Sequence, residues 1–218
     1  MEEIAPYIQR LALWAVPILA AVVFHEVAHG YVAYRLGDAT AARMGRLTLN
    51  PFAHVDPFGT VVLPLLLLFS GAPFLFGYAK PVPVDFLNLR DPRRGMVLVA
   101  LAGPVTNLLL AGISAVVLRA LLSLPVPDSG FLTDNLVVIA HMAKASVFMN
   151  VGLAVFNLLP LPPLDGGRVA TGLLPPSSAL ALARLEPYGM LIIMALLISG
   201  MLDHLLHPMT TLLLHVLL

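Results

Sequence analysis

The order of apolar and polar positions divides the chain into long apolar stretches separated by short polar ones. Spanning a hydrocarbon core of about 30 Å takes roughly 20 apolar residues. Four stretches meet this length, from Tyr7 to Leu36, Met96 to Leu124, Leu136 to Leu159 and Pro187 to Leu206. The pattern predicts an all-α polytopic membrane protein.

A further apolar stretch, Gly59 to Phe76, is shorter and is interrupted by Pro64, Gly71 and Pro73. It could cross the bilayer, or it could enter and return. We expect a re-entrant segment, because only then do the ends of the first and the Leu136–Leu159 helices reach the same depth. The last apolar piece, Met209 to Leu218, is too short to cross and is expected at the interface or against the bundle.

Two stretches have strand character, Arg43 to Leu49 and Gly77 to Phe86. In the second, Pro81 and Pro83 lie two apart, so that both missing donors point the same way, as an edge strand tolerates. The complete fold prediction is about five transmembrane helices, a re-entrant segment and a small membrane-associated β-sheet. No polar linker divides residues 1–218, and we expect a single membrane-embedded domain.

Composition supports a membrane protein and limits its partners. Hydrophobic residues make up 59% of the 218 residues and charged residues 11%, whereas about a quarter of residues are charged in soluble domains. The net charge is zero and the 12 basic residues are scattered, so no stripe for binding nucleic acid is present. The expected partner is the lipid bilayer. There is no cysteine, and a metal would need imidazole and carboxylate ligands.

The strongest chemical motif is His25-Glu26-Val27-Ala28-His29, which is an HExxH pattern on a predicted helix. Residues four apart share a helix face, so both imidazoles can bind one ion, and Glu26 lies close enough to act as a general base on a water there. Ionisable groups inside a membrane helix are costly unless they pair or bind something. We interpret the motif as a metal site. The alternative is a hydrogen-bonded polar cluster or a helix-packing contact without a metal.

A catalytic zinc commonly has three protein ligands and one open position. Asp165 is the best third candidate, because the prolines of the preceding Asn157–Leu164 stretch break a helix and the following two glycines let the chain turn back. An Asp-Gly turn at the membrane surface is the alternative. His54 and Asp56 form a second polar pair. Loop hydrogen bonding is the default interpretation, and a second metal site or a lid contact over the first site are the alternatives.

Three sequence elements, in this order, resemble the site-2 protease family of intramembrane zinc metalloproteases: HEVAHG at His25–Gly30, AGPVTN at Ala102–Asn107 and NLLPLPPLDGGR at Asn157–Arg168. The stretches NPFAHVDPFGT and GYAKPVPV resemble a compact bacterial and archaeal subgroup, and no PDZ or CBS module is recognisable. The resemblance covers most of the chain.

The resemblance implies one zinc ion per chain, held by His25, His29 and Asp165, with Glu26 activating the water. It implies a substrate-binding role for Asn157 and for Asn107, and it places Asn107 near the site. The implied activity is the hydrolysis of peptide bonds in transmembrane proteins or peptides, either in regulated intramembrane proteolysis or in the clearance of remnant signal peptides. The expected location is a prokaryotic inner membrane, multi-pass, and most basic residues favour a cytoplasmic-side active site.

Two other classes of function remain open from the residues alone. In a metal transporter, the same ligands would form a transit site, and Glu26 would be dispensable. In a scaffold that does not cut, the metal would only stabilise the fold, but structural zinc sites are usually closed by four protein ligands. Only three good ligands are present, which favours an enzyme. The sequence does not indicate the oligomeric state.

Overall fold

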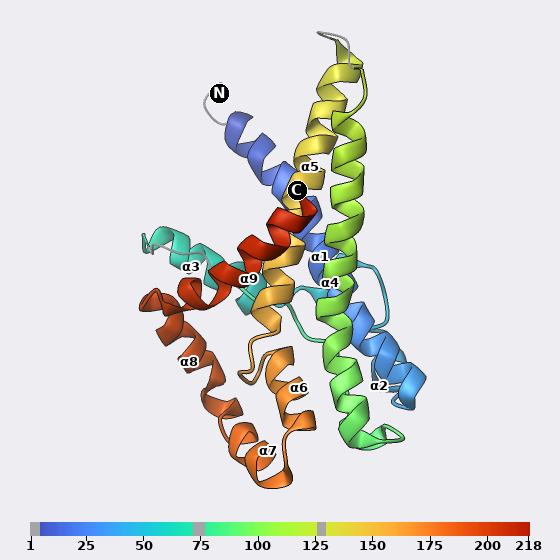
Figure 1. The fold of residues 1–218 in the computed structure, drawn as a ribbon, viewed down its shortest axis with the longest axis vertical. Helices are drawn as coiled ribbons and strands as arrows, with labels where there is room; N and C mark the ends of the chain where they lie inside the picture. The colour runs from blue at the N-terminus through green and yellow to red at the C-terminus, as the bar shows by residue number, and fades with distance from the viewer. Residues whose placement is uncertain (1–4, 72–76, 126–129) are drawn as a thin grey trace.

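The computed structural model describes residues 5–71, 77–125 and 130–218, and the regular structure in these ranges is all helical (Figure 1). Short 3₁₀ turns cover Pro51–His54 and Phe86–Asn88, and a π-helical turn at Pro57–Val62 leads into α3. The α-helices are α1 (Ala5–Leu36), α2 (Thr40–Arg43), α3 (Leu63–Phe69), α4 (Pro92–Leu122), α5 (Phe131–Asn157), α6 (Asp165–Leu173), α7 (Pro176–Ala183), α8 (Glu186–Ile198) and α9 (Met201–Leu217).

Three helices in the described ranges are long and apolar enough to cross a membrane: Leu13–Leu36 within α1, the whole of α4, and Leu132–Asn157 within α5. The pair α7 and α8 would add a fourth if it forms one span, although the two helices meet at a bend of 65°. The predicted number of about five transmembrane helices is therefore too high for the described part of the chain.

The predicted span from Pro187 to Leu206 is divided in two. Gly200 adopts a φ of 72° between α8 and α9, a left-handed conformation that glycine reaches without steric cost. The helix that follows, α9, includes Met209 to Leu218 almost completely, so that this piece is not a separate segment.

The predicted β-sheet is wrong: the described parts of Arg43–Leu49 and Gly77–Phe86 contain no strand. The physical reason is that other groups take the backbone donors and acceptors that a ladder would need. Arg46 donates to the carbonyls of Lys80 and Pro81, and the amides of Val82 and Asp85 donate to side-chain carboxylates. The segment is extended but is held by side chains.

Hydrogen bonds join the chain just before α3 to the chain at Tyr78, after α3. The Tyr78 amide donates to the Gly59 carbonyl at 3.0 Å, and the Thr60 hydroxyl donates to the Tyr78 carbonyl at 2.9 Å. Residues 57–69 are too few to cross a membrane alone. Residues 72–76, which include Pro73, lie outside the described ranges.

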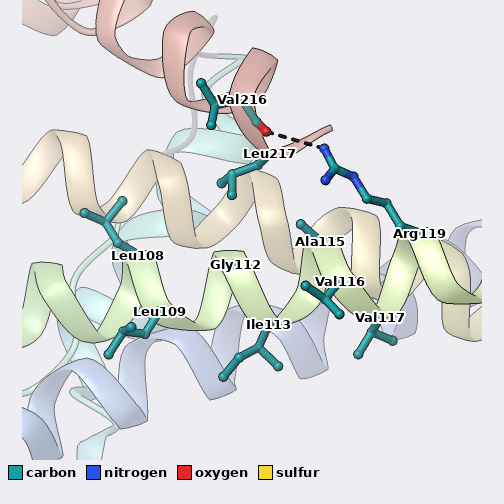
Figure 2. Close-up of a pocket in the computed structure, with 10 residues that line it drawn as sticks. All are labelled: Leu108, Leu109, Gly112, Ile113, Ala115, Val116, Val117, Arg119, Val216 and Leu217. Carbon is teal, nitrogen blue, oxygen red and sulfur yellow. Dashed lines mark hydrogen bonds between the residues drawn. The ribbon is translucent and has the colours of Figure 1, made fainter.

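Helix α4 is the centre of the bundle, with α1, α5 and α6 packed around it (Figure 1). Between α4 and α5, small residues allow close approach, and the leucines of α9 cover them. An apolar groove of about 560 Å³ lies between α4 and the end of α9 (Figure 2). Arg119 is its one charged lining residue, and its guanidinium donates to the Val216 carbonyl. The groove lies away from the HExxH motif.

Candidate metal centre

Helix α1 carries His25 and His29 one turn apart, and both residues are buried. Their rings meet edge to face with centroids 4.6 Å apart, and the two Nε2 atoms are separated by 3.0 Å. The HExxH spacing thus places two potential ligand atoms together, as the sequence predicts.

Asp165 completes this cluster. It is the first residue of α6, where the chain resumes a helix after the proline-rich stretch from Pro160 to Pro163. One carboxylate oxygen, Oδ2, lies 3.2 Å from Nε2 of His25 and 3.3 Å from Nε2 of His29. The side chain is buried and turned into the bundle, so the structure brings together the three residues named from the sequence.

The cluster has the dimensions of a metal site. A tetrahedral zinc with ligands at about 2.0–2.1 Å places neighbouring ligand atoms about 3.3 Å apart, and the three distances observed here are 3.0, 3.2 and 3.3 Å. Although Oδ2 of Asp165 lies close to both imidazoles, it is buried and has no hydrogen-bond partner among the described residues. A buried carboxylate oxygen without a donor fits a cation ligand.

The hydrogen bonds on the far side of each imidazole fix its protonation. Nδ1 of His25 lies 2.6 Å from Oδ1 of Asn107, and Nδ1 of His29 lies 2.7 Å from the Val99 carbonyl. Both partners only accept, so each Nδ1 carries the proton and each Nε2 presents a lone pair in the neutral tautomer. The lone pairs of the two Nε2 atoms then lie next to Oδ2 of Asp165, an arrangement that a bound divalent cation would stabilise.

Gly103 of α4 lies directly against the two imidazoles. A Cβ atom at this position would be 2.4 Å from Nε2 of His29 and 2.5 Å from Cε1 of His25, well inside van der Waals contact. Only glycine therefore allows α4 to approach α1 closely enough for Asn107 and Val99 to reach the histidines.

Asn107 and Asn150 form a buried polar network behind the cluster. The Asn107 amide donates to the Ala21 carbonyl at 3.1 Å and to Oδ1 of Asn150 at 2.8 Å, which leaves its own Oδ1 for His25. Asn107 has an exposed fraction of 0%, so in this structure it contacts His25 and has no free surface for a substrate. Asn150 was not found from the sequence, because one asparagine in an apolar helix belongs to no motif.

The Glu26 carboxylate is bound by a backbone amide that is not part of the metal cluster. One of its oxygens, Oε2, accepts a hydrogen bond from the Val82 amide at 2.7 Å. Val82 is buried, and the chain around it is held because the Arg46 guanidinium donates to the Lys80 carbonyl and the Lys80 amide donates to the His54 carbonyl. The extended segment thus lies beside the glutamate of HExxH, a contact that the motif alone does not predict.

The remaining candidates have local partners. The Asn157 amide donates to the Leu153 carbonyl one turn back at 3.0 Å. His54 bonds to the Thr48 carbonyl, and Asp56 accepts from the amides of Phe58 and Gly59. Neither belongs to a possible metal cluster of the described residues. Loop hydrogen bonding, the default interpretation, describes this pair.

Asp38, which sequence reasoning missed, fixes the turn after α1. Burial alone would raise the pKa of Asp38, but hydrogen bonds from the Thr40 hydroxyl, the Asp85 amide, the Asn88 side chain and the Thr40 amide lower it below its ordinary value. A lowered folded-state pKa stabilises the fold above the usual aspartate range, and this contribution is lost as the pH falls through the lowered value. The carboxylate thus joins the end of α1 to the segment that carries Val82.

The comparisons with known proteins agree with this geometry. The model of Peptidase family M50 matches residues 131–200. The chain is 38% identical over 194 residues to YwhC of Bacillus subtilis, whose name describes a zinc metalloprotease, and the match covers 89% of this chain and 84% of YwhC. It is 30% identical over 203 residues to Rip2 of Mycolicibacterium smegmatis, named in the same way, covering 93% of this chain and 71% of Rip2. No solved structure matches significantly.

Proposed function

The chain belongs to peptidase family M50, the site-2 protease family of zinc metalloproteases, and from this premise we propose that it cleaves peptide bonds of transmembrane substrates within or just below the bilayer. The observation that carries the proposal is the convergence of three ligand atoms, two from the candidate membrane span in α1 and one from α6. His25, His29 and Asp165 are the proposed zinc ligands, one ion per chain, and their geometry fits the ion. A site at this depth suits substrates that are themselves in the membrane.

In the proposed reaction, zinc supplies the Lewis acidity that polarises the scissile carbonyl. Glu26 takes a proton from the attacking water as the water oxygen adds to the carbonyl carbon. The protonated Glu26 side chain then gives this proton to the leaving amine as the C–N bond breaks. The Val82 amide occupies Oε2 of Glu26, which holds the carboxylate in one orientation with Oε1 directed elsewhere. The net reaction converts one peptide bond and one water molecule into a carboxylic acid and an amine.

The two asparagines have different proposed roles. Asn107 orients His25 and keeps its Nε2 available, as its hydrogen bonds support. Asn157 lies at the end of α5, a short distance along the chain from Asp165, and we assign it to contacts with the substrate backbone. Its present bond to Leu153 stays within its own helix, so a substrate carbonyl could replace that partner.

We place the site toward the cytoplasmic side of a prokaryotic inner membrane. Basic residues gather at the end of the bundle that carries α2, α6, α7 and the start of α4, which is the lower end in Figure 1. The positive-inside rule makes that end cytoplasmic. Because the chain lacks cysteine, single cysteines at positions 94 and 119 can be labelled separately: only position 119 should react with an impermeant reagent from outside, and the reverse result would contradict this orientation.

The deciding experiment compares wild type with Glu26→Gln and Asp165→Ala in liposomes, using a panel of single-span substrates and zinc analysis. Wild type should hold one zinc and cut, Glu26→Gln should hold zinc without cutting, and Asp165→Ala should lose zinc. If Glu26→Gln cuts normally, the protease mechanism is wrong. If the Glu26→Gln protein transports zinc, and neither this variant nor wild type cuts a substrate, the site is a transit site.

A further inference from the structure

The end of α6 lacks its ordinary hydrogen-bond donors. The last carbonyls of any helix have no partner within the helix, and here the chain continues as Leu174-Pro175-Pro176. Proline has no amide hydrogen, so the carbonyls of Thr171 and Gly172 have no donor four residues later. The helix that begins with Asp165 therefore needs a donor from elsewhere at its other end.

Arg93 of α4 supplies donors to Gly172 and to the two carbonyls that follow it. Its Nε donates to the Gly172 carbonyl at 2.7 Å, and its Nη2 donates to the carbonyls of Leu173 and Leu174. Among the described residues no carboxylate forms an ion pair with Arg93. A single guanidinium thus binds three successive carbonyls of another element, which a side chain that only anchors at the membrane surface would not do.

Close packing accompanies these hydrogen bonds. A Cβ atom at Gly172 would lie 2.4 Å from Cγ2 of Val97 and 3.2 Å from the Arg93 carbonyl. The end of α6 therefore lies against the first turns of α4, beside it at the lower end of Figure 1. An added methyl group at position 172 would push the two helices apart.

Helix α4 also holds the other two ligands, because Asn107 and the Val99 carbonyl orient His25 and His29. The three ligands come from α1 and α6, and α4 is the element that contacts both. We infer that Arg93 is a positioning residue that sets Asp165 relative to the two histidines by fixing α6 on α4. This inference rests on the proposed zinc role of Asp165.

The test measures zinc affinity by chelator competition for Arg93→Gln and for a matched control, Arg94→Gln. Arg94 is the next residue, its side chain is 88% exposed, and its ion pair is with Asp91 of the preceding turn. We expect Arg93→Gln to weaken zinc binding about 10- to 100-fold, the range for residues that orient metal ligands, and Arg94→Gln to leave it unchanged. Arg93→Lys, which keeps the charge but not the fork, should recover part of the affinity.

Two further measurements separate positioning from general destabilisation. The visible spectrum of the cobalt-substituted protein reports ligand geometry, and it should change in Arg93→Gln and in Gly172→Ala but not in Arg94→Gln. In the Asp165→Ala background, Arg93→Gln should not weaken any further the residual binding of cobalt by the two histidines, measured at high metal concentration. An unchanged spectrum and affinity in Arg93→Gln, or equal effects with and without Asp165, would overturn the inference.

The same variants distinguish this inference from the protease function. If zinc binding to the wild-type site depends on Asp165 and is weakened by Arg93→Gln, but wild type cuts no substrate, the proposed function fails and the positioning role stands. If Asp165→Ala binds zinc as tightly as wild type, Asp165 is no ligand and the inference on Arg93 falls, whatever the protein cuts.

Discussion

Helices α4 and α5 both contribute to two regions of opposite character. The site region consists of His25, His29, Asn107, Asn150 and Asp165, all buried and polar. The apolar region begins one turn further along α4 and is built of small residues under the leucines of α9: Ala111, Ala115, Val147, Val151 and Val155. Its packing resembles that of other membrane helices, in which small side chains let backbones approach.

The difference between the two regions shows where this chain buries polar side chains. Buried polar side chains in a membrane are unfavourable unless they are satisfied, and in the site region the asparagines bond to each other, to the backbone and to His25. Along the same two helices, the apolar region contains the hydroxyl pair of Ser114 and Ser146, which borders the site region because the Asn150 amide also donates to the Ser146 hydroxyl. Polar groups are therefore concentrated where they orient potential metal ligands, and the apolar region supports the helices.

The largest effect is expected from adding one methyl group in the site region. Gly103→Ala would place a Cβ atom against both imidazoles, and we expect zinc affinity to fall by more than ~100-fold, beyond the usual effect of residues outside the ligand set. Gly112→Ala is the matched control on the same helix, because a Cβ atom there meets nothing within 4 Å. Chelator competition on both variants checks this, and equal effects would remove the contrast between the regions.

A smaller effect is expected from Asn107→Ala. The change removes the acceptor that keeps the Nδ1 proton of His25 in place and leaves Asn150 without its donor. We expect zinc affinity to fall about 10- to 100-fold, with the protein still folded. Zinc titration and circular dichroism would test this, and a variant that binds zinc like wild type would show that the network only supports the fold.

The smallest effect is expected in the apolar region. Ser114→Ala removes a 2.8 Å hydroxyl contact between α4 and α5, and interhelical hydrogen bonds in membranes contribute on average roughly 0.6 kcal/mol. Unfolding in detergent should therefore shift by less than about 1 kcal/mol, and zinc affinity should not change. A change in zinc affinity would mean that the apolar region also controls the site.

Hydropathy predicts the three spanning helices well, because long apolar runs have few alternatives in a membrane. Their ends are less predictable: α4 begins at Pro92 rather than at Met96, since the Asp91 side chain caps it and Pro92 is a favourable first residue. The sheet prediction failed because Pro81 and Pro83 cannot donate and side chains bind the neighbouring backbone groups instead. Alternation of residue types carries no information on such long-range partners.

For the site, helix periodicity is sufficient to pair His25 with His29, because both lie on one element. The contacts of Asp165, Asn150 and Arg93 depend on how helices pack, and one sequence contains no direct signal for that packing. The Val82 amide could not be predicted at all, because a backbone group has no residue type. Sequence patterns therefore identify the ligands better than they identify the groups that orient them.

The distribution of the ligands over α1 and α6 has a consequence for biogenesis. The histidines leave the ribosome with the first membrane helix, whereas Asp165 follows only after α4 and α5 have been made. Because metal binding stabilises the folded form only when its ligands are assembled, a nascent chain that ends before α6 should retain zinc weakly. Tight metal loading is then a late event in membrane insertion, and the protein acquires the capacity to cut only after its helices have docked.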